Sequence, residues 1–569
     1  MTTLEERWSA AYADGVPRHG LDYPEGSLVD EFDLATRTWA QKPALDFFGR
    51  RTSYRELAQQ VEAVAGALHT LGVGPGSTVA MLMPTCPQHV VAFYAVLACG
   101  GTVVEHNPLY PAVELAPMFA DHRAEVAIVW DAAAGTVQSL PQEVRPRAIV
   151  AVNLIEQMTP AKRLLLSLPV KKARASRDQL TKPAPEGTIP FGGLLRSKAR
   201  APRENRPGPE DVALLLYTSG TTGAPKGVQL SHRNLLATTT QSRTWVTPLV
   251  PGQEVFMACL PLFHVFGCSL SMNAGLTVGA MIHLIPKPET GLILDAIRRR
   301  TPTTVIAVPP LFERLVAGAK ERGMSLQGIR TGIAGAMPLR PDLVDAWEEA
   351  TGGLLIEGYG LTECSPIVAG NPVDASRTPG SIGVPFPDTH VRLADPEDLD
   401  RDVQIGEAGE ILVKGPQVFS GYRNRPEETA AAFHDGWFRT GDIAVASENG
   451  FLSIVDRLKE MVITGGFNVY PSEVEDAIRG HEGIDDIAVV GMVDELGTEE
   501  VVAAIVTPDG LLPDVEALRR RLKERLTAYK VPRRFHVLSE LPRNEMGKVL
   551  RREVRATLEE LDRRRHRED

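Results

Sequence analysis

Cysteine is scarce in this sequence, and the few cysteines lie far apart. Five cysteines occur among 569 residues, and none of them forms a Cys-x-x-Cys pair. A structural zinc site usually needs such pairs, so it is disfavoured, and we expect reduced thiols, as in a cytosol. The first residues, MTTLEERWSAAYADG, include early acids and no apolar stretch, so no secretory signal is expected.

The sequence also lacks a surplus of positive charge. Lysine and arginine total 61 against 72 aspartates and glutamates, which gives a net charge of −11. A protein that binds nucleic acid needs a basic surface, so no nucleic-acid partner is expected. The sequence gives no indication of an oligomeric state.

One long stretch has no charged side chain. Residues 255–286 contain no Asp, Glu, Lys or Arg, and a membrane span needs about 20 apolar residues. Pro261 splits the stretch, and His264, Asn273 and His283 dilute its apolar character. We therefore expect a buried helix and strand unit of a large core, with a membrane span as the alternative.

Helix and strand signals alternate in the first third of the chain. Ser53 and Glu56 form a capping box before a helical face with apolar residues at spacings of three and four. Short apolar runs at 78–83, 102–105, 126–130 and 148–152 predict strands, with a helix over 89–99 between the first two. This alternation predicts a largely parallel α/β sheet.

A basic segment interrupts this pattern. Within 162–182 the sequence has seven lysines and arginines, one aspartate and four leucines at 164–168. A basic segment that carries leucines can lie on an anionic membrane surface, and it can equally be a solvated insertion before the Pro- and Gly-rich linker 183–209. Both interpretations stay open.

The chemistry begins after an apolar run at 212–217. The next ten residues, TSGTTGAPKG, contain four hydroxyls, three glycines and one lysine. Glycines let backbone N–H groups approach anionic oxygens, and hydroxyls and a lysine add donors and charge, so the run is typical of a phosphate cradle. The glycine spacing differs from that of a Walker A loop. The candidate phosphate-binding residues are Thr218, Ser219, Gly220, Thr221, Thr222, Gly223 and Lys226.

This run and seven further segments resemble motifs of the adenylate-forming superfamily, which includes acyl-CoA synthetases. The segments follow one another in the order in which the motifs of that superfamily occur. The matching segments are 217–227, 261–267, 334–339, 357–363, 439–443, 456–460, 465–471 and 542–548. Residues 107–110 and the basic insertion resemble bacterial long-chain fatty-acid CoA ligases in particular. The resemblance implies a large N-terminal α/β body with mostly parallel sheets, residues 1–456, and a smaller mobile C-terminal α+β domain, residues 457–569, with a hinge near 456–460.

The resemblance also implies site residues. Lys548 would bridge the substrate carboxylate and the α-phosphate of ATP, Thr362 would contact a phosphate, and Glu363 would hold Mg²⁺. His264 would lie near the acyl carboxylate or gate its pocket, with a neutral core histidine as the alternative. The residues implied for the adenine segments of the nucleotide site are Gly335, Ala336, Glu357, Gly358, Tyr359 and Gly360. Asp442 is implied for the ribose, and Arg457 for the ribose or a phosphate. The residues implied for the thioester step are Gly465, Gly466 and Phe467.

The function implied by the resemblance is an ATP-dependent acyl-CoA ligase that activates a medium- or long-chain fatty acid and transfers it to CoA. ATP, Mg²⁺ and CoA are the implied cofactors and co-substrates. The charge-free stretch could line an apolar tunnel, although a buried core would look the same. The alternatives are a ligase for aryl or branched acids, a ligase that loads a carrier protein, and a non-catalytic relative that binds nucleotide or fatty acid. A cytoplasmic location is expected, with peripheral contact to the inner face of a membrane as an option.

The end of the chain is expected to form its own helices and strands. Asp514 is placed to cap a helix with apolar residues at 515, 518, 522 and 526. The mixed charges of 551–569 predict a solvated helix.

Overall fold

A computed structural model describes residues 3–218, 225–247, 249–458, 460–464, 467–493, 499–544 and 547–568. The chain divides into two compact units. Unit 1 comprises Met1–His390 and Lys414–Phe438, and unit 2 comprises Val391–Val413 and Arg439–Asp569. The hinge predicted near 456–460 stays a prediction.

Unit 1 contains an eight-stranded sheet whose central strands are parallel. In sheet order, its strands are β20 (Gly421–Tyr422), β9 (Lys226–Ser231), β8 (Val212–Thr218), β4 (Thr102–Glu105), β3 (Thr78–Leu82), β5 (Val126–Trp130), β6 (Ala148–Val152) and β7 (Ile189–Pro190). The four strands predicted in the first third are confirmed, and only the first of them ends one residue earlier than expected. At one edge of this sheet, β9 runs antiparallel to β8, and β20 runs antiparallel to β9.

A second, nine-stranded sheet of unit 1 also has a parallel centre, from β1 to β14. In sheet order, its strands are β16 (Val384–Pro385), β15 (Ala369–Gly370), β14 (Leu354–Tyr359), β13 (Thr331–Ala334), β12 (Thr304–Ala307), β10 (Val255–Ala258), β11 (Met281–Leu284), β1 (Pro43–Phe47) and β2 (Arg50–Ser53). The charge-free stretch supplies β10 and β11 at the middle of this sheet, so its interpretation as a buried core unit is confirmed. The described part of the chain contains no helix with both the length and the apolar character that a membrane span requires.

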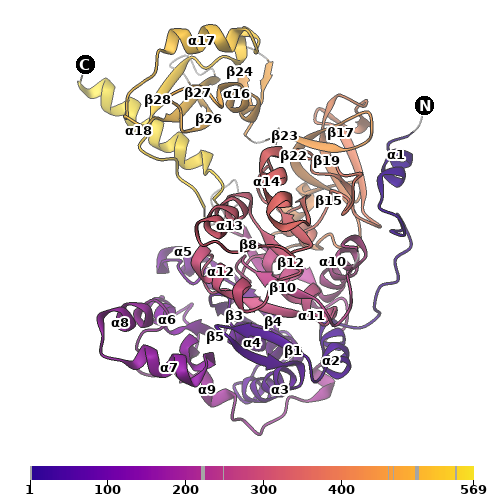
Figure 1. Ribbon diagram of the computed structural model, residues 1–569, viewed down its shortest axis with the longest axis vertical. Coiled ribbons are helices and arrows are strands. Elements are labelled where there is room, and N and C mark those ends of the chain that lie inside the picture. Colours follow the sequence, from indigo (N-terminus) through magenta and orange to yellow (C-terminus); the bar gives the residue numbers. More distant parts are fainter. Residues whose placement is uncertain are drawn as a thin grey trace. The chain divides into compact units, whose positions relative to one another are not determined.

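Helices cover both sheets and fill the layer between them (Figure 1). Helix α4, which is buried along almost its whole length, packs on β4, and α3 packs on β1 of the other sheet. Apolar side chains of α5 and α6 cover the outer face of the first sheet, and those of α12, α13 and α14 cover the second. The long helices of unit 1 are α2 (Leu28–Thr38), α3 (Tyr54–Thr70), α4 (Pro87–Ala98), α5 (Ala112–His122), α10 (His232–Trp245), α12 (Thr290–Arg299), α13 (Pro309–Glu321) and α14 (Pro341–Thr351).

Shorter helices connect these elements. They are α1 (Leu4–Ala11), α6 (Asp131–Gln138), α7 (Pro160–Ser167), α8 (Lys171–Asp178), α9 (Phe191–Leu194), α11 (Ala274–Thr277), α15 (Pro426–Ala431), the 3₁₀ turns η1 (Leu154–Gln157), η2 (Arg203–Asn205) and η4 (Thr362–Cys364), and the π-helical turn η3 (Gly267–Asn273). The predicted capping box is confirmed, because the Ser53 side chain accepts a hydrogen bond from the backbone of Glu56 at the start of α3. Helix α3 then buries the predicted face, including Leu57, Val61 and Leu68.

The described part of unit 2 holds two larger sheets, a two-stranded hairpin and the C-terminal helices. The first sheet is β18 (Asp398–Asp402), β17 (His390–Asp395), β19 (Ala408–Lys414) and β22 (Trp437–Ala446), with β23 (Leu452–Arg457) also paired to β22. The first two residues of β22 still belong to unit 1, and they pair there with β21 (Phe433–His434). Further along are the hairpin of β24 (Val462–Thr464) and β25 (Phe467–Val469), and a three-stranded sheet of β26 (Asp486–Val493), β27 (Glu499–Val506) and β28 (Arg534–Val537). The helical elements are α16 (Pro471–Ile478), α17 (Val515–Lys523), η5 (Ala528–Lys530) and α18 (Arg551–Glu568).

Alternate residues of β26 and β27 face two different helical layers, as a half-buried strand requires. Ile487 and Val489 pack with α16 and α17, and Asp514 caps α17 as predicted. The helix predicted for the last residues is present, but it is not solvated on every side. Val554 and Leu558 of α18 are fully buried against the opposite face of the sheet, because the few apolar residues of this charged helix lie four positions apart.

Candidate active site

The β8–β9 hairpin fixes the two ends of the predicted phosphate cradle. Thr218 is the last residue of β8, Lys226 is the first of β9, and the two are paired across the hairpin. The residues between them that the sequence assigned to phosphate lie outside the described residues: Ser219, Gly220, Thr221, Thr222 and Gly223. β8 is parallel to β4, so the cradle begins where a parallel strand ends, which is the usual ligand edge of such sheets.

Beside this hairpin the structure brings together an acid, a phenol and the cradle lysine. Glu363 lies in η4, and the Tyr422 hydroxyl donates a hydrogen bond of 2.9 Å to its Oε1. The Nζ of Lys226 is 5.1 Å from the centre of the Tyr422 ring. Burial and the neighbouring carboxylate raise the pKa of Tyr422 far above its usual value, so the phenol remains a donor. The predicted metal ligand and the predicted phosphate lysine therefore belong to one cluster.

Tyr422 is a site residue that the sequence analysis missed. It lies in the two-residue strand β20, which pairs with β9, and the backbone N–H of Arg423 donates to the carbonyl of Gly227 at 2.8 Å. A strand of two residues has no periodicity, and Tyr422 is 59 positions from its partner Glu363. No signal in the sequence could have found the pair.

The segments implied for adenine lie next to one another at the carboxyl ends of β13 and β14. Ala334 pairs with Glu357, which puts Gly335 beside Gly358. A Cβ on Gly335 would lie 2.9 Å from the Phe266 ring, and one on Gly360 would lie 1.5 Å from the carbonyl oxygen of Pro366. Gly360 therefore has no room for a side chain, and a side chain on Gly335 would have to displace the Phe266 ring.

Two neighbours of these glycines complete the same edge of the sheet. Ala336 has φ of +67°, and Tyr359 pairs with Ala369 of β15. Thr362 opens η4 directly after this edge and precedes Glu363. The structure thus gathers all the implied adenine residues, Thr362 and Glu363 along one short stretch of the fold.

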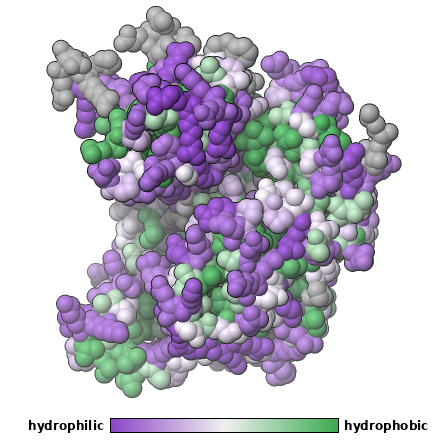
Figure 2. Space-filling view, turned by 45° about the horizontal axis from the view of Figure 1, so that its top comes forward, coloured by the Kyte–Doolittle hydropathy of each residue, from purple (hydrophilic) through white to green (hydrophobic). Residues whose placement is uncertain are grey.

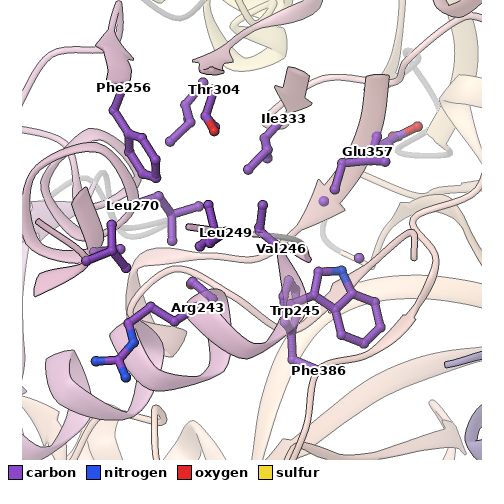
Figure 3. Close-up of a pocket in the computed structure, with 17 residues that line it drawn as sticks. Arg243, Trp245, Val246, Leu249, Phe256, Leu270, Thr304, Ile333, Glu357 and Phe386 are labelled. Carbon is purple, nitrogen blue, oxygen red and sulfur yellow. The ribbon is translucent and has the colours of Figure 1, made fainter. Parts of the chain in front are cut away.

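An apolar pocket opens beside this edge (Figure 3). It encloses about 530 Å³ of atom-free space, its open mouth included. Phe256, Leu270, Ala274 and Val278 from the charge-free stretch line it. That this stretch lines a tunnel for an acyl chain stays a prediction. The other lining residues are Ser242, Arg243, Trp245, Val246, Leu249, Thr304, Ile306, Ile333, Ile356, Glu357, Gly358, Gly370 and Phe386.

Glu357 is the one acidic residue among the residues that line this pocket. Its carboxylate accepts a backbone hydrogen bond of 3.3 Å from Leu339, and burial raises its pKa to about 8. The side chain is therefore neutral at neutral pH, and the pocket wall carries no negative charge there that would repel an organic acid.

His264 follows β10 and packs its ring on Phe263, with ring centres 4.8 Å apart. Burial lowers its pKa to about 4, so the imidazole is neutral at neutral pH. Among the described residues, those that line the apolar pocket do not include His264. Its predicted role near the acyl carboxylate stays a prediction.

Unit 2 brings together the three charged residues that the sequence assigned to ribose and catalysis. Asp442 and Arg457 are paired across β22 and β23, and Arg457 Nε lies 2.9 Å from Asp442 Oδ1. Asp442 is buried. Burial, with a contribution from the Arg457 charge, lowers the pKa of Lys548, and the carboxylates of Glu460 and Asp442 act in the opposite direction.

A tight turn presents Lys548. The backbone N–H of Lys548 donates to the Asn544 side chain, and the backbone N–H of Asn544 donates to the Lys548 carbonyl, both at 2.9 Å. Gly547 in this turn has φ of +80°, which favours glycine. The segment predicted for the thioester step is only partly described: Gly465 and Gly466 lie outside the described residues, and Phe467 begins β25.

Two family models match this chain. One, for the AMP-binding enzymes, matches residues 32–423, and the other, for the C-terminal domain of the same enzymes, matches residues 473–548. The chain belongs to the AMP-binding enzyme family.

The similarity of this AMP-binding enzyme to curated relatives extends over nearly its full length. It is 36% identical over 558 residues to a long-chain-fatty-acid–CoA ligase of Salmonella typhimurium, covering 97% of this chain and 98% of the relative. It is 33% identical over 514 residues to a feruloyl-CoA synthase of an Amycolatopsis species, covering 89% and 94%. The crystal structure of an anthranilate CoA ligase in complex with anthranoyl-AMP superimposes with a TM-score of 0.80 at 25% identity, covering 95% of this chain and 98% of that one.

Proposed function

We propose that this AMP-binding enzyme is an ATP-dependent acyl-CoA ligase that activates a medium- or long-chain fatty acid. The observation that carries the proposal is the apolar pocket, which opens at the same strand ends that hold the implied adenine segments and Glu363. A site of this kind can hold an alkyl chain in the pocket with its carboxylate beside a nucleotide phosphate.

The reaction needs two steps because a carboxylate is a poor electrophile. In the first, a carboxylate oxygen attacks the α-phosphorus of ATP, the bond to the bridging oxygen breaks, and pyrophosphate leaves with the electron pair. In the second, the CoA sulfur attacks the acyl carbon of the adenylate, and AMP leaves. Both reactants of the first step are anions, so the protein must neutralise charge and position them.

The residues of this chain suit these tasks. Thr218 and Lys226 would bind the phosphates that leave, and Lys548 would neutralise charge between the carboxylate and the α-phosphate. Asp442 can accept hydrogen bonds from two ribose hydroxyls, next to Arg457. Glu363, held by the Tyr422 hydroxyl, is a hard oxygen ligand and fits Mg²⁺, which would neutralise phosphate charge when bound.

The lining of the pocket favours a fatty acid over an aryl acid. Most of the lining side chains are apolar, and the only ionisable ones are Arg243 and Glu357, whose raised pKa keeps its carboxyl neutral. Aryl acids that carry hydroxyl or amino groups need polar partners in the pocket. Ferulate and anthranilate, the acids named in two of the relatives, are therefore the second candidates.

The enzyme would take its substrates, ATP and CoA, from the cytoplasm. We propose that it works there, with peripheral contact to a membrane through the segment 162–182.

A pyrophosphate-release assay over saturated acids of graded length, ferulate and anthranilate tests the substrate. We expect turnover to rise with chain length and to be low with both aryl acids. Offering CoA or a phosphopantetheinylated carrier protein tests the acceptor, and we expect thioester only with CoA. If none of the acids leads to pyrophosphate release, the proposal is refuted and a non-catalytic relative is supported.

A further inference from the structure

The basic insertion of unit 1 folds into a helical hairpin, α7–α8, that is held firmly at both ends. At its start, the Nζ of Lys162 lies over the Phe48 ring, 5.1 Å from its centre. At its end, Trp130 Nε1 donates to the Leu180 carbonyl at 2.9 Å, and the Lys182 backbone donates to Asp131 at 3.0 Å. The hairpin therefore has a fixed orientation on unit 1, unlike a loose linker.

The last turn of α7 and the residues that lead from it to α8 form the tip of this hairpin, residues 164–170. This tip exposes a group of large apolar side chains. Leu164 is 69% exposed and Leu165 60% exposed, and Leu168 and Val170 beyond them are 41% and 53% exposed. Helix α7 buries none of its residues. Four of the thirteen exposed large hydrophobic residues in the described part of the chain thus lie within seven positions.

This gathering of apolar side chains is visible on the surface. Figure 1 places α7 and α8 at the lower left, and the same region of Figure 2 shows hydrophobic surface beside hydrophilic residues. Apolar groups that gather on an exposed surface usually mark a contact with another molecule or with a membrane.

Positive charge surrounds this tip. Arg163 precedes the leucines, and Lys171, Lys172 and Arg174 follow on α8, all of them exposed. Asp178 is the only acid between residues 162 and 182, whereas the whole chain has a net charge of −11. A basic patch on an otherwise acidic protein favours binding to an anionic surface. Apolar side chains inside that patch favour a surface into which they can insert, such as the headgroup region of a bilayer.

We infer that the α7–α8 hairpin is a docking site for an anionic lipid bilayer, with the leucine tip inserted at the boundary of headgroups and acyl chains. Arg163, Lys171, Lys172 and Arg174 would bind lipid phosphates around the tip. The inference rests on the proposed peripheral location and is independent of the acid that the enzyme activates. It places unit 1 at the surface in which long-chain fatty acids dissolve.

Co-sedimentation of the full chain with lipid vesicles tests the inference. One vesicle set contains phosphatidylglycerol and phosphatidylcholine, and the other contains phosphatidylcholine alone. We expect binding to the anionic set, at least about tenfold weaker binding to the neutral set, and weakening at high salt. Equal binding to both sets, or binding to neither, would refute the docking site, and binding to neither would leave an acidic protein as the remaining partner.

Paired variants separate this hairpin from the rest of the surface. Leu164→Ser with Leu165→Ser, and Lys171→Glu with Lys172→Glu, should each weaken binding to anionic vesicles at least about tenfold. The matched controls are Leu511→Ser with Leu512→Ser and Arg520→Glu with Arg521→Glu, which change exposed residues of unit 2. Controls that weaken binding as much as the hairpin variants would overturn the assignment.

Pyrophosphate release by the same variants is measured in solution with a soluble acid. This assay reports on the fold and on the proposed activity independently of vesicle binding. We expect pyrophosphate release to be unchanged, because the substituted side chains are exposed and lie outside the candidate active site. Loss of vesicle binding only in variants that also lose activity would mean misfolding and would contradict a local docking role.

Discussion

Replacing Ala274 by leucine should shorten the acids that the enzyme accepts. Ala274 lies on α11, is 4% exposed and lines the apolar pocket. Leucine adds about three methylene-sized groups to the wall, so an acid that fills the pocket loses room for about three methylenes. Each buried methylene contributes about 0.8 kcal/mol, which gives about 2.4 kcal/mol, or a loss of about 60-fold in kcat/KM for the longest acids.

The assay is pyrophosphate release over saturated acids of graded length, in the wild type and the variant. Acids shorter by about three carbons or more should keep their wild-type kcat/KM, because they leave that part of the pocket empty. Ala556→Leu on the exposed surface of α18 is the matched control, and it should leave the length profile unchanged. An equal loss with all acids would mean a general packing defect, and an unchanged profile would show that the pocket does not hold the acyl chain.

Three further predictions concern the ionisable residues Lys548, Tyr422 and Glu357. Lys548→Ala should slow adenylate formation by about 10²-fold or more, yet leave CoA able to consume supplied acyl-adenylate; equal loss in both steps would contradict its role. Tyr422→Phe keeps the ring beside Lys226 but removes the donor to Glu363, so the Mg²⁺ concentration for half-maximal pyrophosphate release should rise about 10- to 100-fold, and an unchanged Mg²⁺ dependence would separate Glu363 from the metal. The Glu357 carboxyl has its pKa raised from 4.5 to about 8, so it is protonated in the fold where the unfolded chain has ionised. The free energy of unfolding should therefore fall as the pH rises from about 4.5 to about 8, and thermal melts of Glu357→Gln should show a weaker fall than the wild type over that range.

Motifs that are continuous in the chain could be located from the sequence. The apolar run before TSGTTGAPKG predicted a strand that leads into a phosphate cradle, and the structure has Thr218 and Lys226 at the two ends of a β-hairpin. The helical spacing of Leu57, Val61 and Leu68 predicted the buried face of α3. Periodicity and turn residues act over a few neighbouring positions, so they can be read without knowledge of distant partners.

The surroundings of these motifs could not be located in this way. The hydrogen bond of Tyr422 to Glu363 joins residues 59 positions apart, and the pocket collects side chains from α10, β10, α11, β12, β13 and β14. The raised pKa of Glu357 arises from burial, which is a property of its packed neighbours. The charges of 551–569 likewise predicted a solvated helix, whereas Val554 and Leu558 are buried against β26 and β27.

The sequence by itself thus determined the alternation of strands and helices, the order of the nucleotide motifs and the acidic character of the chain. The tertiary structure alone decided which side chains meet: the acid with its phenol, the lysine with its aromatic ring, and the glutamate with an apolar wall. The physical reason is that hydrogen bonding and burial act between groups that are close in space, and only the packing of the sheets brings such distant positions together.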